Sequence, residues 1–439
     1  MLTSTNAPMQ LYEQSLKHGN VFRLALPQWA PFIICMDAAT TKDILMDKHS
    51  DKPDVYKVLE VPRGCPILIT KKTMSSGPTG WPSERKALAP CFAKSNYDMA
   101  NLEKHLAKLN AHLEVLVLEK TGVGVLVDAP RLMCQFTIDA FASSAFGVAL
   151  ESMGGPLSSL GNTFLDEVRI AHVELILNQA VAPWRRWRVW DPEVRRGNVA
   201  ASRCLDVGKQ VINSGRQRRK EHPEHEVGGV MKVLLDFPGF TSEVQRAGEV
   251  VSFLTGGYDT TGYTLSWVLF ELARHPQEQS ALADELRAQD CGEHLPPRLD
   301  RVIKEAMRLW PVTAGGGTRI ASRDFATSSG LIIAKGSHVS VSMYGAFRQQ
   351  WVKDANEFLP DRWREDAPQV TELHEFIIPF NKGRRNCIGQ THALMTIKAT
   401  IAYLVRKYEW SISAPGPKPV YFLTLKPEGL DLGVKKRAL

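Results

Sequence analysis

One predicted helix, over residues 242–274, constrains the fold more than any other feature of the sequence. Ser242 and Gln245 form a plausible capping box at its start. His275 precedes a proline and so marks its end, because a residue before proline is disfavoured in the α region. About 33 residues at 1.5 Å per residue give a length of about 50 Å. We therefore expect this helix to cross the whole molecule.

The remaining sequence predicts a large α-rich body and a smaller β-rich part. Apolar residues make up 44% of the 439 residues and charged residues 23%, as in globular proteins with a large core. Helical patterns dominate residues 83–309, with further helices near Leu11 and over residues 39–48. Strand patterns lie near both ends, at residues 21–26, 32–35, 331–333, 339–342 and 421–426. Because the β part draws on both ends of the chain, residues 1–439 are expected to form one mainly α (α+β) domain.

Charge and cysteine content exclude several classes of protein. The net charge of +7 is too mild for obligate nucleic-acid binding, but it suits an acidic protein partner or an anionic membrane surface. The seven cysteines are scattered, with no Cys-x-x-Cys pair, so neither a zinc site nor a disulfide framework is indicated. No run approaches the roughly 18 apolar residues of a membrane-spanning helix, and no secretory signal is present.

Residues 380–389, which read Phe-Asn-Lys-Gly-Arg-Arg-Asn-Cys-Ile-Gly, carry the strongest chemical signal. Gly383 and Gly389 would let the backbone turn sharply and approach a flat ligand. Arg385 would supply a fixed cation for a carboxylate. Backbone N–H groups in a tight loop can donate to the sulfur of Cys387 and spread its negative charge.

Phe380, at the start of this segment, would pack beneath the loop and keep it dry. The pattern F-x-x-G-x-R-x-C-x-G resembles the haem-binding loop of the cytochrome P450 family. That resemblance implies haem b (iron protoporphyrin IX) as the cofactor and Cys387 as its axial thiolate ligand. The alternative is a buried structural cysteine beside a basic turn.

A second motif, Gly-Gly-Tyr-Asp-Thr-Thr at residues 256–261, falls in the middle of the long predicted helix. Each interior glycine costs about 1 kcal/mol relative to alanine, so something must require the space. Thr260 can hydrogen-bond into the helix and bend it. The motif resembles the family's distal-side (A/G)-G-x-(D/E)-T-(T/S) sequence, which implies that Gly256 lies against the cofactor and that Thr260 and Asp259 relay protons. A glycine pair that serves only helix packing is the alternative.

The sequence also contains the family's acid–base motifs. Glu305 and Arg308 are three residues apart on one predicted helix, which alone would indicate only a surface ion pair. Together with Arg362 they match the family's E-x-x-R and F-x-P-x-R segments in order and spacing. The resemblance implies a buried, structural charge network.

Three further residues are candidate contacts for the haem propionates. Trp81 and Arg85 form a W-x-x-x-R pattern at one-turn spacing, where the family places propionate contacts. Arg319 is a third candidate by the same resemblance. A core tryptophan with an exposed arginine is the alternative for the first pair.

The resemblance implies a haem–thiolate monooxygenase that inserts one atom of O2 into an apolar small molecule. No flavin or iron–sulfur module is recognised, so electrons are expected from NADPH through a flavoprotein reductase or a ferredoxin-type donor. Two alternatives remain open, a haem–thiolate isomerase or dehydratase of peroxides and a non-catalytic haem sensor or carrier. Candidate substrate walls lie at residues 54–74, 253–257, 312–317 and 422–424.

Residues 183–190, Pro-Trp-Arg-Arg-Trp-Arg-Val-Trp, mix aromatic rings with cations. Such a mixture suits a membrane interface, although a solvated basic face is the alternative. The N-terminal anchor and proline-rich hinge of many family members are not found. We therefore expect the cytosolic face of the endoplasmic reticulum if an anchor was removed, and otherwise the cytoplasm.

Overall fold

The computed structural model describes residues 5–25, 32–61, 64–118, 125–177, 183–222, 229–288, 295–412 and 416–438. The α-helices are α1 (Ala7–His18), α2 (Ala38–Met46), α3 (Trp81–Leu88), α4 (Met99–Leu118), α5 (Ala129–Phe146), α6 (Leu160–Ile176), α7 (Pro192–Glu221), α8 (Gly229–Asp236), α9 (Glu243–Arg274), α10 (Pro276–Ala288), α11 (Pro297–Leu309), α12 (Met343–Ala346), α13 (Val370–Phe376) and α14 (Gln390–Lys407). The strands are β1 (Val21–Leu24), β2 (Phe32–Cys35), β3 (Val125–Asp128), β4 (Thr318–Ile320), β5 (Phe325–Ala326), β6 (Ile332–Ile333), β7 (His338–Val341), β8 (Tyr408–Ile412), β9 (Lys418–Tyr421), β10 (Leu425–Glu428) and β11 (Asp431–Lys436). The predicted mainly α architecture with a small β part is confirmed.

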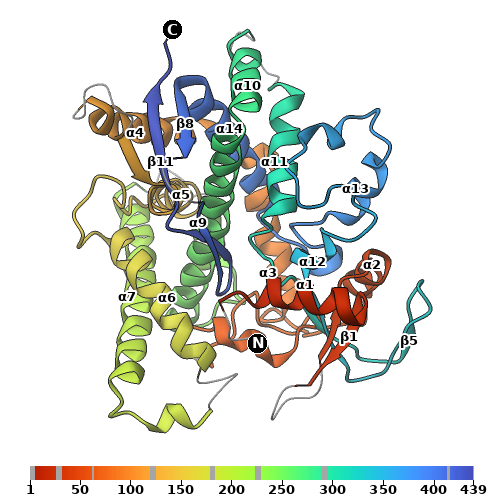
Figure 1. The fold of residues 1–439 in the computed structure, drawn as a ribbon. Helices are drawn as coiled ribbons and strands as arrows, with labels where there is room; N and C mark the ends of the chain where they lie inside the picture. The colour runs from red at the N-terminus through yellow and green to blue at the C-terminus, as the bar shows by residue number, and fades with distance from the viewer. Residues whose placement is uncertain are drawn as a thin grey trace.

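The predicted long helix is α9, which runs through the middle of the molecule (Figure 1). The Ser242 hydroxyl caps it by accepting from the Gln245 backbone N–H at 3.1 Å. The capping box is not reciprocal, because the Gln245 side chain accepts from the Thr241 N–H instead. α9 packs against α5, α7, α11 and α14, so it forms the common wall of the core.

The β part is divided into small sheets that join distant segments. β1 and β2 form the predicted antiparallel hairpin, and β2 pairs in parallel with β7 in a four-stranded sheet of order β1-β2-β7-β4. A three-stranded sheet of order β3-β11-β8 fastens the start of α5 to the C-terminal end of the chain. The strand expected at residues 421–426 is confirmed only at its two ends. Tyr421 ends β9 and pairs with Leu425, which begins β10, while residues 422–424 form the turn between them.

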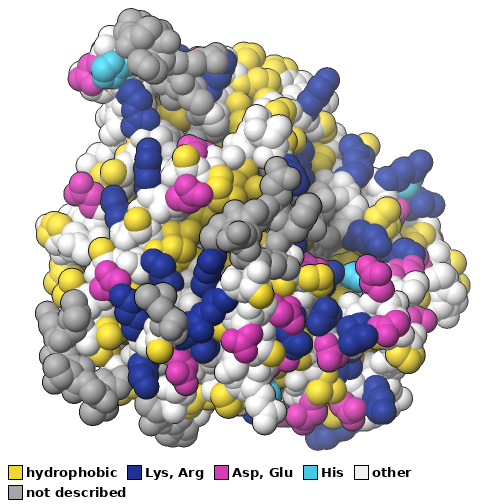
Figure 2. All heavy atoms as spheres, turned by 90° about the horizontal axis from the view of Figure 1, so that it is seen from above, with side chains coloured by type: hydrophobic (Ala, Val, Ile, Leu, Met, Phe, Trp, Pro, Cys, Tyr) yellow, Lys and Arg dark blue, Asp and Glu magenta, His cyan; other side chains and the backbone are white. Residues whose placement is uncertain are grey.

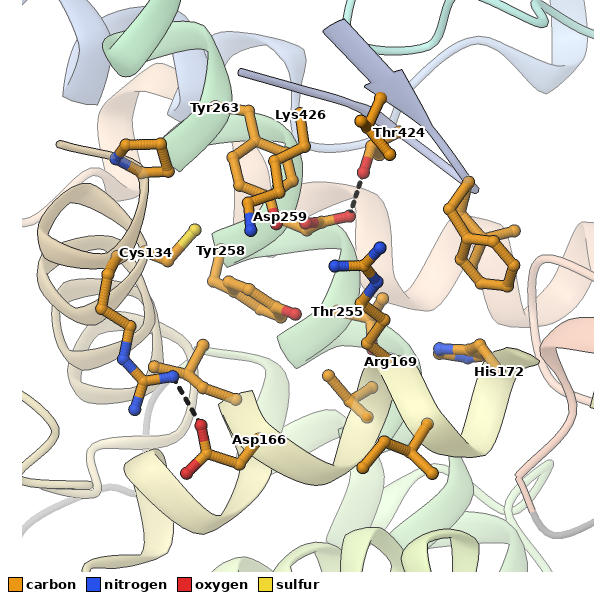
Figure 3. Close-up of a pocket in the computed structure, with 18 of the residues that line it drawn as sticks. Cys134, Asp166, Arg169, His172, Thr255, Tyr258, Asp259, Tyr263, Thr424 and Lys426 are labelled. Carbon is orange, nitrogen blue, oxygen red and sulfur yellow. Dashed lines mark hydrogen bonds and ion pairs between the residues drawn. The ribbon is translucent and has the colours of Figure 1, made fainter. Parts of the chain in front are cut away.

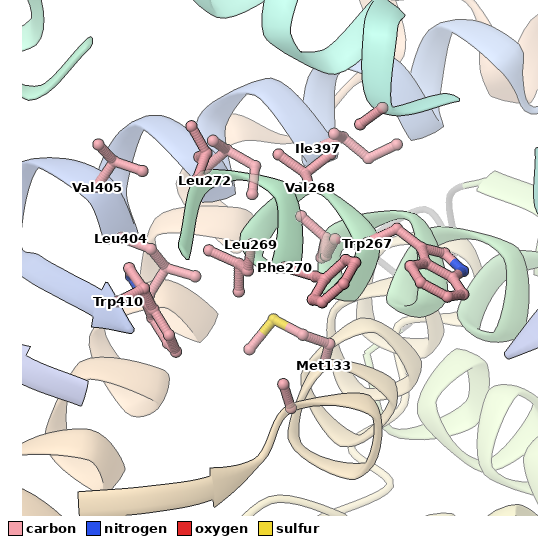
Figure 4. Close-up of a cluster of buried hydrophobic side chains, with 14 of the residues drawn as sticks. Met133, Trp267, Val268, Leu269, Phe270, Leu272, Ile397, Leu404, Val405 and Trp410 are labelled. Carbon is pink, nitrogen blue, oxygen red and sulfur yellow. The ribbon is translucent and has the colours of Figure 1, made fainter. Parts of the chain in front are cut away.

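The C-terminal half of α9 is buried on all sides by apolar residues. Figure 4 shows Trp267, Val268 and Leu269 packed between Met133 of α5 and Ile397 of α14. The Trp267 ring stacks on Trp310 with centroids 4.1 Å apart. The N-terminal half of α9 belongs to a second cluster with α5, α7 and α8. The helix is therefore held at both ends, and its small residues lie between the two clusters.

The outer surface carries no single dominant charge on the face that Figure 2 shows, where basic and acidic side chains alternate with apolar ones. Among the described residues, no helix combines the length and the apolar character needed to cross a bilayer.

Candidate functional site

Cys387 lies in a tight loop between the 3₁₀ turn η7 (Gly383–Arg385) and the start of α14. Its N–H donates to the Phe380 carbonyl at 2.9 Å, which closes the loop. Gly383 has φ +76°, and a Cβ there would lie 2.3 Å from the Leu45 carbonyl oxygen. Only glycine fits that position without strain.

The expectation that Gly389 also allows a sharp turn is wrong. Its φ is −90°, which any residue can adopt. A Cβ there would meet only Phe92, at 3.8 Å. Gly389 lines the same cavity as Cys387. A small residue is therefore needed at this position only if a ligand in that cavity lies close to the backbone.

The charge environment of Cys387 is mixed. Burial raises the pKa of the thiol, while the Gly389 N–H and the positive charge of Arg85 act in the opposite direction. The loop also precedes the N-terminus of α14, where the helix dipole favours an anion. Cys387 is the exposed member of the described cysteines, and its side chain opens into an internal cavity.

That cavity has a volume of about 320 Å³ and lies between the Cys387 loop and the middle of α9. Gly256 and Thr260 line it from the α9 side. A Cβ on Gly256 would have no atom within 4 Å, whereas one on Gly257 would meet the Phe141 ring at 2.6 Å. The two glycines are thus needed for different reasons. Gly257 permits the packing of α9 on α5, and Gly256 leaves the cavity open.

Thr260 and its neighbour Asp259 do not share this cavity. The Thr260 hydroxyl donates to the Gly256 carbonyl at 2.8 Å, the back-bond that its position in the motif predicts. The Asp259 carboxylate points to the other side of α9, where it accepts from the Thr424 hydroxyl at 2.5 Å (Figure 3). Burial raises the pKa of Asp259 to about 6, against hydrogen bonds from Thr424 and Tyr263.

A group of buried or half-buried cations lies along one edge of the Cys387 cavity. Arg385 lies 4.5 Å above the Trp81 ring and donates to the Ile69 carbonyl at 2.9 Å. Arg85 donates to the Asn386 side chain at 2.9 Å. Lys52, which the sequence did not single out, is 8% exposed and lines the same cavity.

Arg319 is also buried, but it lies near this edge without forming part of the cavity wall. Burial is the main cause that lowers the pKa values of Lys52, Arg319 and Arg385, and the neighbouring arginines contribute to the lowering for Lys52 and Arg385. The negative charge of Asp51 raises the pKa of all three of these cations. Its Oδ1 already accepts a hydrogen bond from the Thr73 N–H. Among the described residues, Nη1 of Arg385 is buried without a hydrogen-bond partner. The edge therefore fits a group with more than one negative charge, as the two propionates of haem require.

Glu305, Arg308 and Arg362 come together as one buried network. Arg308 donates to both Glu305 oxygens, at 2.9 and 2.8 Å, and Arg362 donates to Glu305 at 2.9 Å. The Leu359 N–H and the Trp363 indole complete the acceptor set of the carboxylate. Burial alone would raise the pKa of Glu305, but the bonds and charge of Arg308 and Arg362 hold it below its ordinary value.

The expected substrate walls are divided between two cavities. Leu68, Ile69, Phe253 and Val312 line the Cys387 cavity, and Phe380 lies there too. Residues 422–424 line the cavity of Asp259 instead. The glycines at 315–317 face neither cavity: a Cβ at each would clash with Tyr421, Val341 or Asn381, so this run serves close packing.

Comparison with known families decides the family of this chain. A family model described as "Cytochrome P450" matches residues 2–433. The chain belongs to the cytochrome P450 family. By family, it is a haem–thiolate monooxygenase.

Curated cytochrome P450 relatives match nearly the full chain. Cytochrome P450 4d2 of Drosophila melanogaster is 26% identical over 96% of this chain and 87% of its own length. Cytochrome P450 4A7 of Oryctolagus cuniculus is 27% identical over 97% and 86%. The cytokinin hydroxylase of Arabidopsis thaliana is 26% identical over 92% and 78%.

Solved cytochrome P450 structures share the fold. The crystal structure titled cytochrome P450 (CYP102L1) superposes with a TM-score of 0.81 at 20% identity, covering 98% of both chains. The cytochrome P450DA heme domain gives 0.81 at 21% identity, covering 100% of this chain and 94% of its own.

Proposed function

We propose that Cys387 binds the haem iron through its thiolate and that residues 1–439 act as one catalytic domain. When bound, haem supplies the activation of O2, and thiolate ligation favours O–O cleavage. The observation that carries the proposal is the placement of Cys387 opposite Gly256 and Thr260 in one cavity, with buried or half-buried cations at one edge. Lys52, Arg85 and Arg385 would hold the propionates there, with Trp81 beneath Arg385 and Arg319 behind them.

Thr260 is the proton-holding residue of this proposal, because its hydroxyl lies on the cavity side of α9. Asp259 would supply protons to it. Since the Asp259 carboxylate bonds to Thr424 on the opposite side, delivery requires that this side chain leave Thr424 and turn toward Thr260. Glu305, Arg308 and Arg362 serve structure, because they join α11 to the segment that leads into the cysteine loop.

The substrate of this proposal is an apolar small molecule held above the haem. Ile69, Phe253 and Val312 provide apolar walls, and Thr260 provides a polar group at the reacting side. Such a wall orients a substrate mainly by excluding water and by shape.

Electrons would come from a separate protein, a flavoprotein reductase fed by NADPH or a ferredoxin-type donor. Arg384 and Lys86 are exposed on the outer side of the cysteine loop and of α3. Cations at the rim of a docking face speed association with an acidic partner.

Peripheral membrane contact is the last part of the proposal. Trp184, Trp187 and Trp190 are 51%, 62% and 70% exposed, which is unusual for such large rings. Arg185 pairs with Glu174, so the aromatic rings rather than this cation would contact lipid. Membrane contact would place the protein at the cytosolic face of the endoplasmic reticulum, and its absence would place it in the cytoplasm.

Turnover with labelled dioxygen tests the reaction class. The purified holoprotein is supplied with a reductase, NADPH, a panel of apolar substrates and ¹⁸O2. We expect one labelled oxygen atom in the product and the other in water. Product formed from an organic hydroperoxide without any reductant would favour the isomerase or dehydratase alternative.

A further inference from the structure

A second cavity, of about 270 Å³, lies on the opposite side of α9 from Cys387. Its walls come from α5, α6, α9 and the β9–β10 hairpin (Figure 3). No described residue lines both cavities. α9 therefore separates two spaces, with Thr255 and Asp259 facing one and Gly256 and Thr260 facing the other.

The inner end of this second cavity presents a polar group that the protein leaves unused. Tyr258 is 6% exposed, and within the described residues its hydroxyl has no hydrogen-bond partner. Figure 3 shows that hydroxyl pointing into the cavity, toward the Arg169 side chain. Because Tyr258 lines this cavity, a ligand or water there can complete the hydrogen bonding of its hydroxyl.

Two cations at the mouth are also poorly paired. Arg169 and Lys426 approach the same carboxylate, Glu428, at 3.7 and 4.0 Å. Both distances are too long for a direct hydrogen bond. Arg131, on the same cavity wall, is by contrast paired with Asp166 at 2.6 Å. The mouth thus offers two guanidinium or ammonium groups to an incoming anion.

The remaining wall is apolar and aromatic. Phe422 and Val420 come from the hairpin, and Val168 and Ile170 come from α6. His172 is buried in the same wall, and burial lowers its pKa to about 4, so it is neutral at pH 7. A ligand that satisfies all these groups combines one negative charge with a small apolar body.

We propose that this cavity binds a small organic carboxylate, whose anionic end pairs with Arg169 and Lys426 while the Tyr258 hydroxyl donates to it. The apolar body of the ligand lies against Phe422 and Val168. The volume of about 270 Å³ lies just below the usual range for ligand cavities, which begins at about 300 Å³, so the site suits a molecule about as large as a single aromatic acid.

Such a ligand would act on Asp259 directly. Arg169 and Lys426 now favour the charged form of that carboxylate. An added anion beside the same two cations would raise the pKa of Asp259 further and weaken its bond to Thr424. The cavity is distinct from that of Cys387, so this proposal can fail without the proposed monooxygenase function, and the reverse.

The test is calorimetric titration of the holoprotein with benzoate while saturating imidazole occupies the iron side. We expect saturable binding of one benzoate per chain. Benzamide, the neutral analogue, should bind about tenfold more weakly. Arg169→Gln and Lys426→Gln should each weaken benzoate binding about twofold to fivefold, as expected for partly exposed ion pairs. Tyr258→Phe removes one hydroxyl and should weaken binding severalfold.

Arg203→Gln is the matched control, because Arg203 is an exposed arginine that pairs with Glu167 and lines neither cavity. Its affinity for benzoate should equal that of the unaltered protein. Four results would each overturn the proposal. They are absence of benzoate binding, equal affinity for benzoate and benzamide, unchanged benzoate affinity in Arg169→Gln, and loss of all benzoate binding when imidazole is added. Thermal unfolding of each variant establishes that it is folded.

Discussion

Asp259 and Thr260 are consecutive residues of α9, yet their side chains face different cavities. Thr260 lies opposite Cys387, whereas Asp259 bonds to Thr424 on the far side of the helix. Successive residues of a helix are rotated by about 100°, so an adjacent acid and alcohol diverge unless one of them rearranges. This geometry separates the group that faces the Cys387 cavity from the group that faces the second cavity.

Replacement of Thr260 tests its role on the cavity side. Thr260→Ala should lower the product formed per NADPH oxidised by roughly tenfold, because the variant loses the Thr260 hydroxyl, the proposed proton-holding group of the Cys387 cavity. Thr260→Ser should restore most of the coupling. Thr255→Ala is the control, since Thr255 makes the same type of back-bond, to Val251, but faces the other cavity. Equal coupling in Thr260→Ala and Thr255→Ala would remove Thr260 from the proton path.

The Glu305 network predicts a large loss of stability. Glu305→Gln leaves Arg308, fully buried, and Arg362 without their anion, so unfolding free energy should fall by about 3–5 kcal/mol, with loss of haem. Glu278→Gln provides the comparison, because Glu278 also pairs with an arginine, Arg298, but is partly exposed. We expect about 1 kcal/mol or less there. Urea unfolding of both variants measures these losses of unfolding free energy. Similar losses in Glu305→Gln and Glu278→Gln would contradict the structural role of the Glu305 network.

Glu249 predicts a stability that declines as pH rises. It is fully buried beside Glu84, and burial followed by that neighbour raises its pKa to about 8. The folded protein therefore keeps a proton that the unfolded chain releases above about pH 4.5, so the contribution of Glu249 falls between about pH 4.5 and 8, by at most about 1.4 kcal/mol per unit.

Glu249→Gln should flatten that decline, because the amide oxygen can still accept from the Leu68 N–H without carrying charge. Thermal unfolding from pH 5 to 8 measures the slope. Glu243→Gln is the control: Arg216 lowers the pKa of Glu243, so this variant should leave the slope unchanged in the same range. A slope that is as steep in Glu249→Gln as in the parent protein would show that the Glu249 carboxyl is charged throughout.

Lys52 is predicted to hold a propionate. Lys52→Met keeps most of the length of the side chain and removes its charge, so haem should transfer to an acceptor protein about three to ten times faster. Lys209→Met is the control, because Lys209 is about half exposed, pairs with Asp206 and lines neither cavity. Equal transfer rates for the two variants would exclude Lys52 from the cation edge.

The sequence predicted what local signals determine. Ser242 and the His275–Pro276 pair gave the bounds of α9 to within one residue, because capping and proline geometry act within a single turn. The β1–β2 hairpin was likewise predicted from two neighbouring apolar runs. The sequence analysis did not predict that the side chains of the 256–261 motif face two different cavities. Helical spacing contains that information, because residues 256, 260 and 264 lie on one face of the helix and residues 255, 259 and 263 on another.

Nonlocal contacts explain what the sequence did not predict. Val125 and Val434 are neighbours in the sheet but more than 300 residues apart in the chain, so neither strand has a local signal for its partner. Lys52 precedes a proline and belongs to no motif recognised in the sequence. Only the fold brings it beside Arg385. The turn at residues 422–424 interrupts a mostly apolar segment, because the chain reverses there between β9 and β10 beside the second cavity.

The carbon monoxide difference spectrum of the reduced holoprotein tests the central claim, that Cys387 is the thiolate ligand of haem. We predict a strongly red-shifted Soret band, and its loss in Cys387→Ser, while Cys204→Ser, which changes a buried cysteine away from the site, keeps the band. A band at the position of histidine-ligated haem in the unaltered protein, or an unchanged band in Cys387→Ser, would contradict the assignment of Cys387 as the iron ligand.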